Sequence, residues 1–247
     1  MRTVIIIPAL NEEKAITQVV KGALAHVDWV IIADNGSTDE TARLAQAAGA
    51  EVTLAPKPGY GRACLAGVAQ AISADLYLFM DGDGADNAND IPRLLEPILN
   101  GDTDFVIGSR ALGTAEPKSL TFPQKFGNWL ACFLMRLIWK AEFTDLGPMR
   151  AIRRDAYEKL EMSAKTYGWT VQMQVRAAKA KIRTLDVPVN YKRRIGKSKI
   201  SGTVRGVILA GFHILGVIAF EAVSFAPYRS VVFNSSNKQR SVHGSRD

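Results

Sequence analysis

The feature that most constrains the fold is a regular alternation between short apolar segments and longer helical patterns. The apolar segments are nearly continuous in hydrophobicity, which is typical of strands covered on both faces. They occupy residues 3–7, 29–33, 51–55, 76–80 and 104–108. The patterns between them predict helices over residues 12–25, 38–48, 61–73 and 91–100. This repeated β-α-β order predicts an α/β fold with a mostly parallel sheet and right-handed crossovers.

Size and composition fit a globular protein with a negatively charged partner. The 247 residues are 47% hydrophobic, enough to bury a substantial core. Lys and Arg outnumber Asp and Glu by 31 to 24, so a nucleotide, a nucleic acid or an anionic membrane surface would each suit the formal charge of +7. Two cysteines and three scattered histidines argue against a disulfide framework and a zinc site. With no signal-peptide pattern at the N-terminus, we expect a reducing, cytoplasmic compartment.

Polar loops that contain glycine or acidic residues follow the predicted strands. In chain order they read PALNEE, DNGSTDE, PKPGYGRA, DGDGAD and GSRALG. Because ligands of parallel sheets bind beyond the carboxyl ends of the strands, these loops predict a binding site along one edge of the sheet. For any single loop, an ordinary turn is the better interpretation. Their accumulation on one edge favours a site.

Two aspartates at the end of the fourth predicted strand are candidates for a metal site. Gly82 and Gly84 let the backbone turn, so the carboxylates of Asp81 and Asp83 can approach one cation. Two carboxylates do not fill the shell of Mg²⁺ or Mn²⁺, which prefers about six oxygen ligands. Phosphates of a nucleotide substrate commonly supply several of the others. The motif therefore predicts a divalent cation shared with a phosphorylated ligand.

Five motifs, in this order and spacing, resemble the nucleotide-sugar-binding half of family-two glycosyltransferases of the GT-A fold. They are IIPALNEE, IIADNGSTDE, GYGRACLAG, FMDGDGAD and VIGSR. Two later motifs, DLGPMRAIRRDAY and RRIGKSKISGT, resemble the dolichol-phosphate mannosyltransferase-like subgroup, which makes polyprenyl-phosphate sugars. The resemblance covers roughly residues 3–205 and implies a GT-A catalytic domain over residues 1–202.

The resemblance also implies roles for individual residues. Asp83 would be the direct ligand of Mg²⁺ or Mn²⁺, while Asp81 would reach the ribose or a metal-bound water. The residues implied to bind the nucleotide sugar are Pro8, Ala9, Asn11, Glu12, Asp34, Asn35, Gly61, Asp81 and Gly82. Two positions depart from the family pattern. Asn35 stands where a second acid is usual, and Ala85 stands where relatives can carry a glutamine, for which Asp86 or water could compensate.

Basic and glycine residues near the strand ends are candidates for phosphate contacts. The Gly59-Tyr60-Gly61 turn precedes a predicted helix, so its backbone could approach phosphate or sugar. A plain strand-to-helix turn is an equally good interpretation. Arg110 is a better candidate, because a guanidinium group matches two phosphate oxygens at once.

The loop TDLGPMR, residues 144–150, forms the predicted far wall of the site. We expect Arg150 to pair with the acceptor phosphate and Asp145 to orient neighbouring basic groups. The alternative is an Asp–Arg pair that only holds the turn.

The loop YKRRIGKSKISG, residues 191–202, follows a predicted edge strand at 182–191. Its five positive side chains repel one another, so we expect the loop to be mobile until an anion binds. We expect Arg194 and Lys197 to close over the diphosphate and the lipid phosphate. A solvated basic surface is the alternative.

Two apolar helical segments lie in the second half of the chain. The segment at 121–141 is too short to span a bilayer and predicts an amphipathic helix that lies at a membrane interface or packs on the core. The segment at 203–226 predicts a hydrophobic helix that spans a membrane, lies on it or packs on the core. We expect the polar tail, residues 227–247, to be disordered.

Taken together, the residues and the resemblance imply a metal-dependent, inverting hexosyltransferase. It would move a sugar from a nucleoside-diphosphate donor, such as GDP-mannose or UDP-glucose, to polyprenyl or dolichyl phosphate. An ionised acceptor phosphate needs no strong general base. We expect a peripheral or monotopic protein on the cytoplasmic face of a membrane, with no nucleic acid partner. A transferase with a soluble acceptor and a nucleotide-sugar-binding protein without catalysis are the alternatives.

Overall fold

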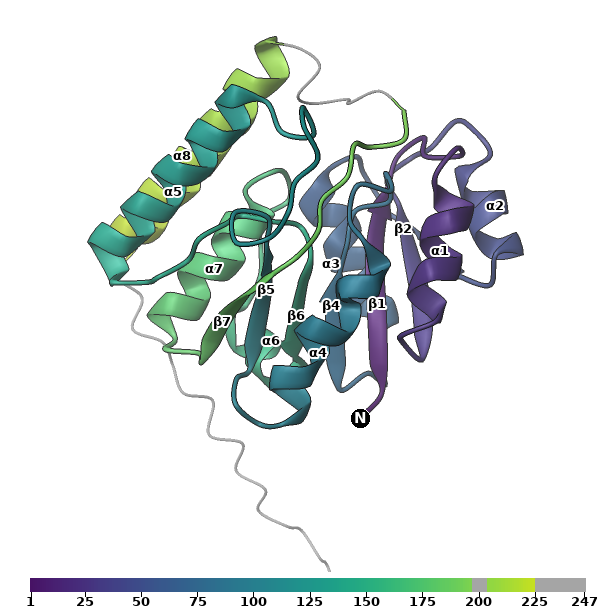
Figure 1. The fold of residues 1–247 in the computed structure, drawn as a ribbon, viewed down its shortest axis with the longest axis horizontal. Coiled ribbons are helices and arrows are strands. Elements are labelled where there is room, and N and C mark those ends of the chain that lie inside the picture. The colour runs from purple at the N-terminus through teal and green to yellow at the C-terminus, as the bar shows by residue number, and fades with distance from the viewer. Residues whose placement is uncertain (197–203, 225–247) are drawn as a thin grey trace, which may run out of the picture.

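A seven-stranded sheet forms the centre of the molecule (Figure 1). The structure is a computed structural model and describes residues 1–196 and 204–224. The strands are β1 (Thr3–Ala9), β2 (Trp29–Asp34), β3 (Glu51–Leu54), β4 (Leu76–Phe79), β5 (Phe105–Ser109), β6 (Arg150–Arg153) and β7 (Thr184–Pro188). Their spatial order is β3-β2-β1-β4-β6-β5-β7. Within this sheet, β6 is antiparallel to β4 and β5, while the other neighbours pair in parallel.

Helices cover both faces of the sheet (Figure 1). They are α1 (Ile16–Leu24), α2 (Thr41–Ala47), α3 (Tyr60–Gln70), α4 (Ile91–Leu99), α5 (Phe122–Trp139), α6 (Arg154–Lys159), α7 (Trp169–Lys179) and α8 (Val204–Val223), with a short 3-10 turn, η1 (Ala88–Asp90), before α4. One apolar core lies between the sheet and α1, α2 and α4. The other lies between the sheet and α3, α5, α6 and α7.

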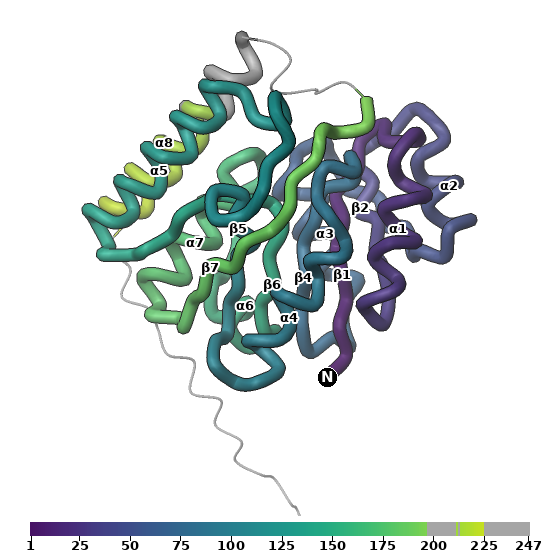
Figure 2. Tube along the Cα trace, viewed as in Figure 1, coloured from purple at the N-terminus to yellow at the C-terminus, as the bar shows by residue number. Residues whose placement is uncertain are grey.

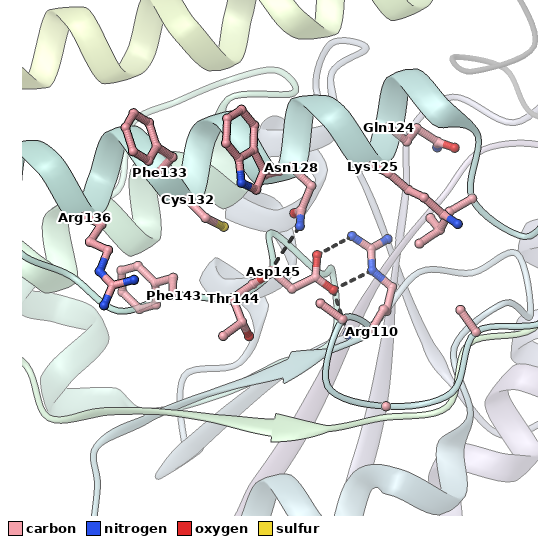
Figure 3. A pocket seen from close by; sticks show the side chains of 15 residues that line it. Arg110, Gln124, Lys125, Asn128, Cys132, Phe133, Arg136, Phe143, Thr144 and Asp145 are labelled. Carbon is pink, nitrogen blue, oxygen red and sulfur yellow. Dashed lines mark hydrogen bonds and ion pairs between the residues drawn. The ribbon is translucent and has the colours of Figure 1, made fainter.

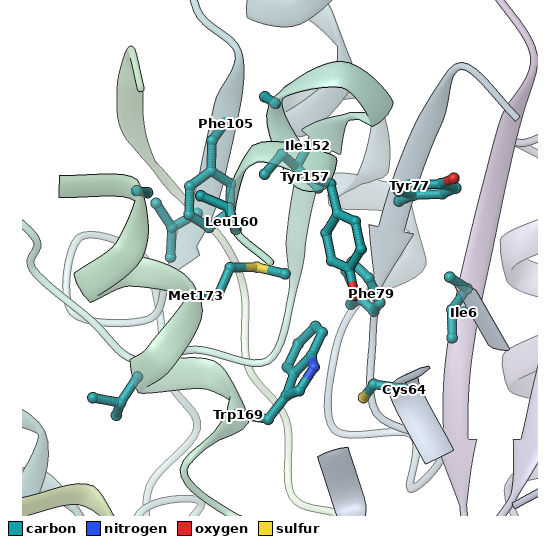
Figure 4. Packing of buried hydrophobic residues seen from close by; sticks show 14 of the residues in the cluster. Ile6, Cys64, Tyr77, Phe79, Phe105, Ile152, Tyr157, Leu160, Trp169 and Met173 are labelled. Carbon is teal, nitrogen blue, oxygen red and sulfur yellow. The ribbon is translucent and has the colours of Figure 1, made fainter. Parts of the chain in front are cut away.

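Successive strand residues point into opposite cores, which explains why the strands are almost continuously apolar. Ile5 and Leu78 point toward α1 and α4, whereas Ile6 and Phe79 point toward α3 and α7. Figure 4 shows the second core, where Phe79 meets Trp169 edge-to-face with ring centroids 4.7 Å apart. Aromatic pairs of this geometry add to the stabilisation that comes from burial alone.

The α/β fold and its mostly parallel sheet are confirmed. The five predicted strands correspond to β1 to β5, and the four predicted helices correspond to α1 to α4. The later strand is β7, and it lies at the edge of the sheet as its proline suggested. Neither β6 nor α6 was predicted. The sequence of β6, RAIR, is short and half of its residues are charged, so it lacks the apolar pattern of a strand. Its strand conformation comes from pairing with two neighbours rather than from local propensity.

The two apolar segments of the second half form α5 and α8, which pack side by side (Figure 1). At the start of α5, the side-chain oxygen of Gln124 accepts a hydrogen bond from Thr121 N at 2.8 Å, as in a capping box. The helix ends at Trp139, and the residue that caps it, Lys140, has a left-handed φ of 57°. Among the described residues, no helix has the length and hydropathy needed to cross a membrane.

Candidate active site

A pocket with acidic side chains lies at the carboxyl-end edge of the sheet. We call it the acidic pocket; its volume is about 360 Å³. Loops that follow β1, β2, β3, β4 and β7 contribute to it. The predicted site residues that line it are Pro8, Ala9, Glu12, Asn35, Asp81, Gly82, Asp83 and Arg194. Gly59 and Tyr60 of the predicted glycine turn also line it, as do Thr166 and Tyr167, which the sequence did not single out.

The carboxylates of the acidic turn, residues 81–86, lie close together after β4. Asp83 Oδ1 accepts a hydrogen bond from Ala85 N at 2.9 Å, and Asp86 Oδ2 accepts one from Asp81 N at 3.0 Å. Burial and then repulsion by Asp83 raise the pKa of Asp81 to about 6. Burial, with repulsion from Asp81 and Asp83, raises the pKa of Asp86 well above its usual range. A bound cation would therefore stabilise the ionised form of this turn.

Tyr60 holds Asp81 in this arrangement. Its hydroxyl donates to Asp81 Oδ1 at 3.0 Å, and its ring lies edge-to-face on Trp169 with centroids 6.3 Å apart. Burial, followed by the charge of Asp81, raises the pKa of the Tyr60 hydroxyl well above its usual range, so this group stays a donor. Tyr60 therefore orients a carboxylate without neutralising it.

The acidic turn fits a hard divalent cation only if other oxygens complete the shell. In the described part of the chain, no group of three or more His, Cys, Asp or Glu side chains is arranged to hold a metal. Asp81 and Asp83 supply carboxylates to the same pocket. The carboxylate of Asp86 instead accepts from the backbone of the turn. The oxygen donors suit Mg²⁺ or Mn²⁺, with a diphosphate or water as the remaining ligands.

Three predicted site residues, Asp34, Asn35 and Asn11, lie where β1 and β2 end, and they differ in what they contact. Asp34 accepts hydrogen bonds from Ser37 N at 3.1 Å and from Ser37 Oγ at 2.5 Å. Asn11 Oδ1 accepts from Thr38 N at 2.7 Å, which ties the β1 loop to the same turn. Asn35 Oδ1 accepts from Gly59 N at 2.7 Å, and Asn35 lines the acidic pocket. Of these three predicted site residues, Asn35 is therefore the one placed to meet a ligand there.

Gly61 has a structural reason to be glycine. A Cβ at this position would lie 2.1 Å from the carbonyl oxygen of Ala164, so the backbone of α3 crosses the segment before α7 very closely. Gln172 fixes that segment, because its side-chain oxygen accepts from Ser163 N at 2.9 Å and Ala164 N at 2.7 Å. Gly61 itself does not line the acidic pocket, whereas Gly59 and Tyr60 of the same turn do.

The chain after β7 crosses the carboxyl-end edge of the sheet (Figure 2). We call residues 190–196 the strap. Lys192 N donates to Ala85 O at 2.8 Å and Ile195 N donates to Asp83 O at 2.9 Å, which pins the strap to the acidic turn. Tyr191 N donates to Thr114 O at 2.9 Å on its other side. Backbone hydrogen bonds thus place the described part of this loop against the acidic turn.

Arg194 extends from the strap into the acidic pocket. Its Nη2 lies 2.6 Å from Asp83 Oδ2, and the Asp83 side chain is only 6% exposed. The guanidinium group is therefore in the site, as predicted, but paired with a carboxylate of the chain. Lys197, the other basic residue predicted here, lies outside the described residues.

A second pocket lies between α5 and the loops that follow β5 and precede β6 (Figure 3). We call it the α5 pocket; its volume is about 560 Å³. Its apolar lining includes Trp129, Phe133 and Phe143. Its positive groups are Arg110, Lys125 and Arg136.

Arg110 lines the α5 pocket and pairs with Asp145 there. Its Nε and Nη2 each donate to a carboxylate oxygen of Asp145 at 2.8 Å, and Arg110 N donates to the same carboxylate at 2.7 Å (Figure 3). Its guanidinium carbon lies 5.0 Å from the centroid of the Tyr191 ring. From there its positive charge acts on Asp81 and Asp86. Asp145 thus orients a basic group, as expected, and that group is Arg110.

Arg150 does not reach either pocket, contrary to the expectation that it meets the acceptor phosphate. Its side chain is fully buried at the start of β6. Nη1 donates to Thr170 O at 3.0 Å, and Nη2 donates to Gly147 O. Burial lowers the pKa of Arg150 to about 10. The side chain ties the 144–150 loop to α7, which is a structural role, although its partners are carbonyls rather than Asp145.

Comparison with known proteins identifies the family. The model of "Glycosyl transferase family 2" matches residues 4–161. An uncharacterized glycosyltransferase of Mycobacterium tuberculosis is 34% identical over 209 residues, covering 83% of this chain and 93% of the relative. Undecaprenyl-phosphate mannosyltransferase of Micrococcus luteus is 30% identical over 222 residues, covering 83% and 90%.

A solved structure supports the same conclusion about the fold. Glucosyl-3-phosphoglycerate synthase from Mycobacterium tuberculosis, solved with Mn²⁺, UDP and glucosyl-3-phosphoglycerate, matches with a TM-score of 0.73 at 21% identity. The match covers 90% of this chain and 80% of that one. With the sheet, the acidic turn and these likenesses in agreement, the chain belongs to glycosyltransferase family 2 and has the GT-A fold.

Proposed function

We propose that the protein transfers a hexose, with inversion, from a nucleoside-diphosphate sugar to a polyprenyl phosphate. The observation that carries this proposal is a pair of pockets, in which Arg110 lines the second and its positive charge acts on the acidic turn of the first. One pocket offers carboxylates and a guanidinium group, which suits a metal-bound diphosphate. The other offers basic groups beside an apolar helix face, which suits a phosphate on a hydrocarbon chain.

In this scheme the donor lies in the acidic pocket. Asp81 and Asp83 would hold Mg²⁺ or Mn²⁺, which would neutralise negative charge on the departing diphosphate. Tyr60 keeps Asp81 oriented through its hydroxyl group. Asn35 would face the nucleoside end of the pocket, where the Nδ2 group of its amide can donate to the base.

The acceptor phosphate would lie in the α5 pocket against Arg110. The pair with Asp145 uses Nε and Nη2, so Nη1 is the part of the guanidinium group that can bind an oxygen of the acceptor. Lys125 would add positive charge from α5. A phosphate held in this way is already ionised near neutral pH, so it can attack the sugar without a protein base.

The exposed face of α5 supports membrane contact. Five large apolar side chains with helical spacing are each at least 48% exposed: Phe122, Phe126, Trp129, Phe133 and Leu137. The rings of Trp129 and Phe133 stack with centroids 5.6 Å apart. Aromatic side chains with flanking basic residues are typical of helices that lie in a membrane interface. We therefore place the protein at a membrane surface, where a lipid acceptor would enter the α5 pocket directly.

The named relatives point to two kinds of acceptor. The Micrococcus luteus relative is named for undecaprenyl phosphate, whereas the glucosyl-3-phosphoglycerate synthase structure contains a soluble product. The aromatic lining of the α5 pocket favours the lipid acceptor, because a small phosphorylated acid would leave it unfilled.

A donor and acceptor panel tests the proposal. Radiolabelled UDP-glucose and GDP-mannose are each incubated with Mn²⁺ or Mg²⁺ and with either undecaprenyl phosphate or 3-phosphoglycerate. We expect label to enter the organic phase with at least one donor, and mass spectrometry to find the glycosyl-phosphate lipid. Product in the aqueous phase alone would establish a soluble acceptor. Donor binding without transfer or hydrolysis would identify a binding protein.

A further inference from the structure

Asp83 carries an internal counter-ion. One oxygen of its carboxylate accepts from Ala85 N at 2.9 Å, and the other lies 2.6 Å from Arg194 Nη2. Because the side chain is 6% exposed, solvent does little to screen its charge. The carboxylate that the proposed donor site assigns to a cation is therefore already paired with a positive group of the chain.

The ion pair is not what keeps Arg194 beside the acidic turn. Backbone hydrogen bonds on both sides do so, from Lys192 N to Ala85 O and from Ile195 N to Asp83 O, at 2.8 and 2.9 Å. Farther back, Asn190 N donates to Asp90 Oδ2 at 2.7 Å. The Arg194 backbone can therefore stay in place when the guanidinium group leaves Asp83, and the side chain, 31% exposed, has room to turn within the pocket.

A divalent cation at Asp83 would change this balance. It would share the carboxylate with Arg194 and repel the guanidinium group at close range. A diphosphate that arrives with the cation offers the guanidinium group a new partner, because its oxygens match the two donors of an arginine fork. Either ligand alone leaves one of the two charged groups without a partner.

We propose that Arg194 is the counter-ion of Asp83 in the empty site and that metal and diphosphate displace it together, the metal taking Asp83 and the diphosphate taking Arg194. This exchange rests on the proposed donor site but not on the identity of the acceptor. It makes binding of metal and diphosphate mutually dependent, since each ligand releases the partner that the other requires. Arg194 therefore opposes binding of metal alone and favours binding of the metal–diphosphate pair.

The test is calorimetric titration of the full chain with Mn²⁺ alone, and with UDP or GDP at saturating Mn²⁺. In Arg194→Ala, we expect the affinity for Mn²⁺ alone to rise on the order of tenfold, because the competing cation is gone. The affinity for diphosphate at saturating Mn²⁺ should fall on the order of tenfold or more, because the guanidinium contact is lost. Arg194→Gln, which keeps an amide donor without the charge, should shift both affinities in the same directions.

Arg193→Ala is the matched control. Arg193 lies on the same strap but donates to Pro117 O and, through its backbone, to Glu116. We expect it to leave both affinities unchanged. Circular dichroism melting curves would show whether the Arg194 variants are folded at the titration temperature.

Opposite shifts in the two affinities support the exchange even if no lipid product forms in the transfer assay. If both Arg194 variants bind Mn²⁺ alone no better than the wild type, Arg194 does not compete with metal and the inference is wrong. If the wild type binds neither diphosphate at saturating Mn²⁺, the proposed donor site itself is wrong, and the exchange falls with it.

Discussion

At the scale of single residues, Asp81 combines a functional position with a cost in stability. Its pKa is raised to about 6, so in the metal-free protein its ionised form is disfavoured in the folded state. As pH rises from about 4 to about 6, Asp81 must ionise in the folded state, and the free energy of unfolding of the wild type should therefore fall. A variant with an uncharged side chain at this position should not show this fall.

We predict that Asp81→Asn is more stable than the wild type at pH 7 without metal. The amide oxygen can still accept from the Tyr60 hydroxyl, so the packing is preserved. The difference in the free energy of unfolding should grow between about pH 4 and pH 6 and reach about 1–3 kcal/mol. Denaturant titrations across this range measure it, and Mn²⁺ with UDP should reverse the order. A difference that does not depend on pH would show that Asp81 is not the titrating group.

Asn35 is a second residue with a sharp expectation. Because its Oδ1 accepts from Gly59 N, the assignment of the amide is fixed and the Nδ2 group is the one offered to the pocket. A donor there suits a base with a carbonyl oxygen, as in uracil and guanine.

We predict that Asn35→Ala weakens binding of UDP and GDP on the order of tenfold, since it removes the Nδ2 donor that would face the base. Binding of pyrophosphate, which has no base, should change much less. Equal losses for pyrophosphate and for the nucleotides would show that the variant disturbs the turn at Gly59 rather than a contact with the base.

At the scale of secondary-structure elements, α5 presents the clearest contrast between its two faces. One face packs through Ala131, Cys132 and Met135, while the opposite face exposes an aromatic row that includes Trp129 and Phe133. An isolated exposed apolar residue needs no explanation, but a continuous row does.

We predict that the double variant Trp129→Ser/Phe133→Ser binds anionic lipid vesicles at least about tenfold more weakly than the wild type. The reason is that it removes the apolar area of two aromatic side chains from the membrane contact. Vesicle sedimentation measures the bound fraction. Leu54→Ser is the control, because Leu54 is also 67% exposed but lies on β3, at the far edge of the sheet from β7. Equal loss in both variants, or no binding by the wild type, would contradict the proposed orientation at the membrane.

At the scale of the whole molecule, the features that could be predicted are those that depend on residues close together in the sequence. The β-α-β alternation gave the sheet, and the DGDG motif gave the acidic turn. The pairings of Asp83 with Arg194 and of Arg110 with Asp145 join segments that are far apart in the sequence. The sequence marked the turn that contains Tyr60, but not the hydrogen bond from Tyr60 to Asp81, which forms only in the folded chain. The expectation for Arg150 was wrong because a basic residue near a Gly-Pro turn is typical of an exposed loop. Here the residue begins β6, and the pairing of β6 with β4 places it in the interior.

The antiparallel strand β6 also sets a length within the site. Because β6 lies between β4 and β5, the ends of these two strands are held two strand spacings apart, roughly 9–10 Å. The acidic turn follows one of them and Arg110 follows the other. The backbone hydrogen bonds of the sheet therefore fix the distance between the position proposed for the departing diphosphate and the position proposed for the incoming phosphate. The sheet itself would therefore set the distance between the two phosphates that flank the transferred sugar.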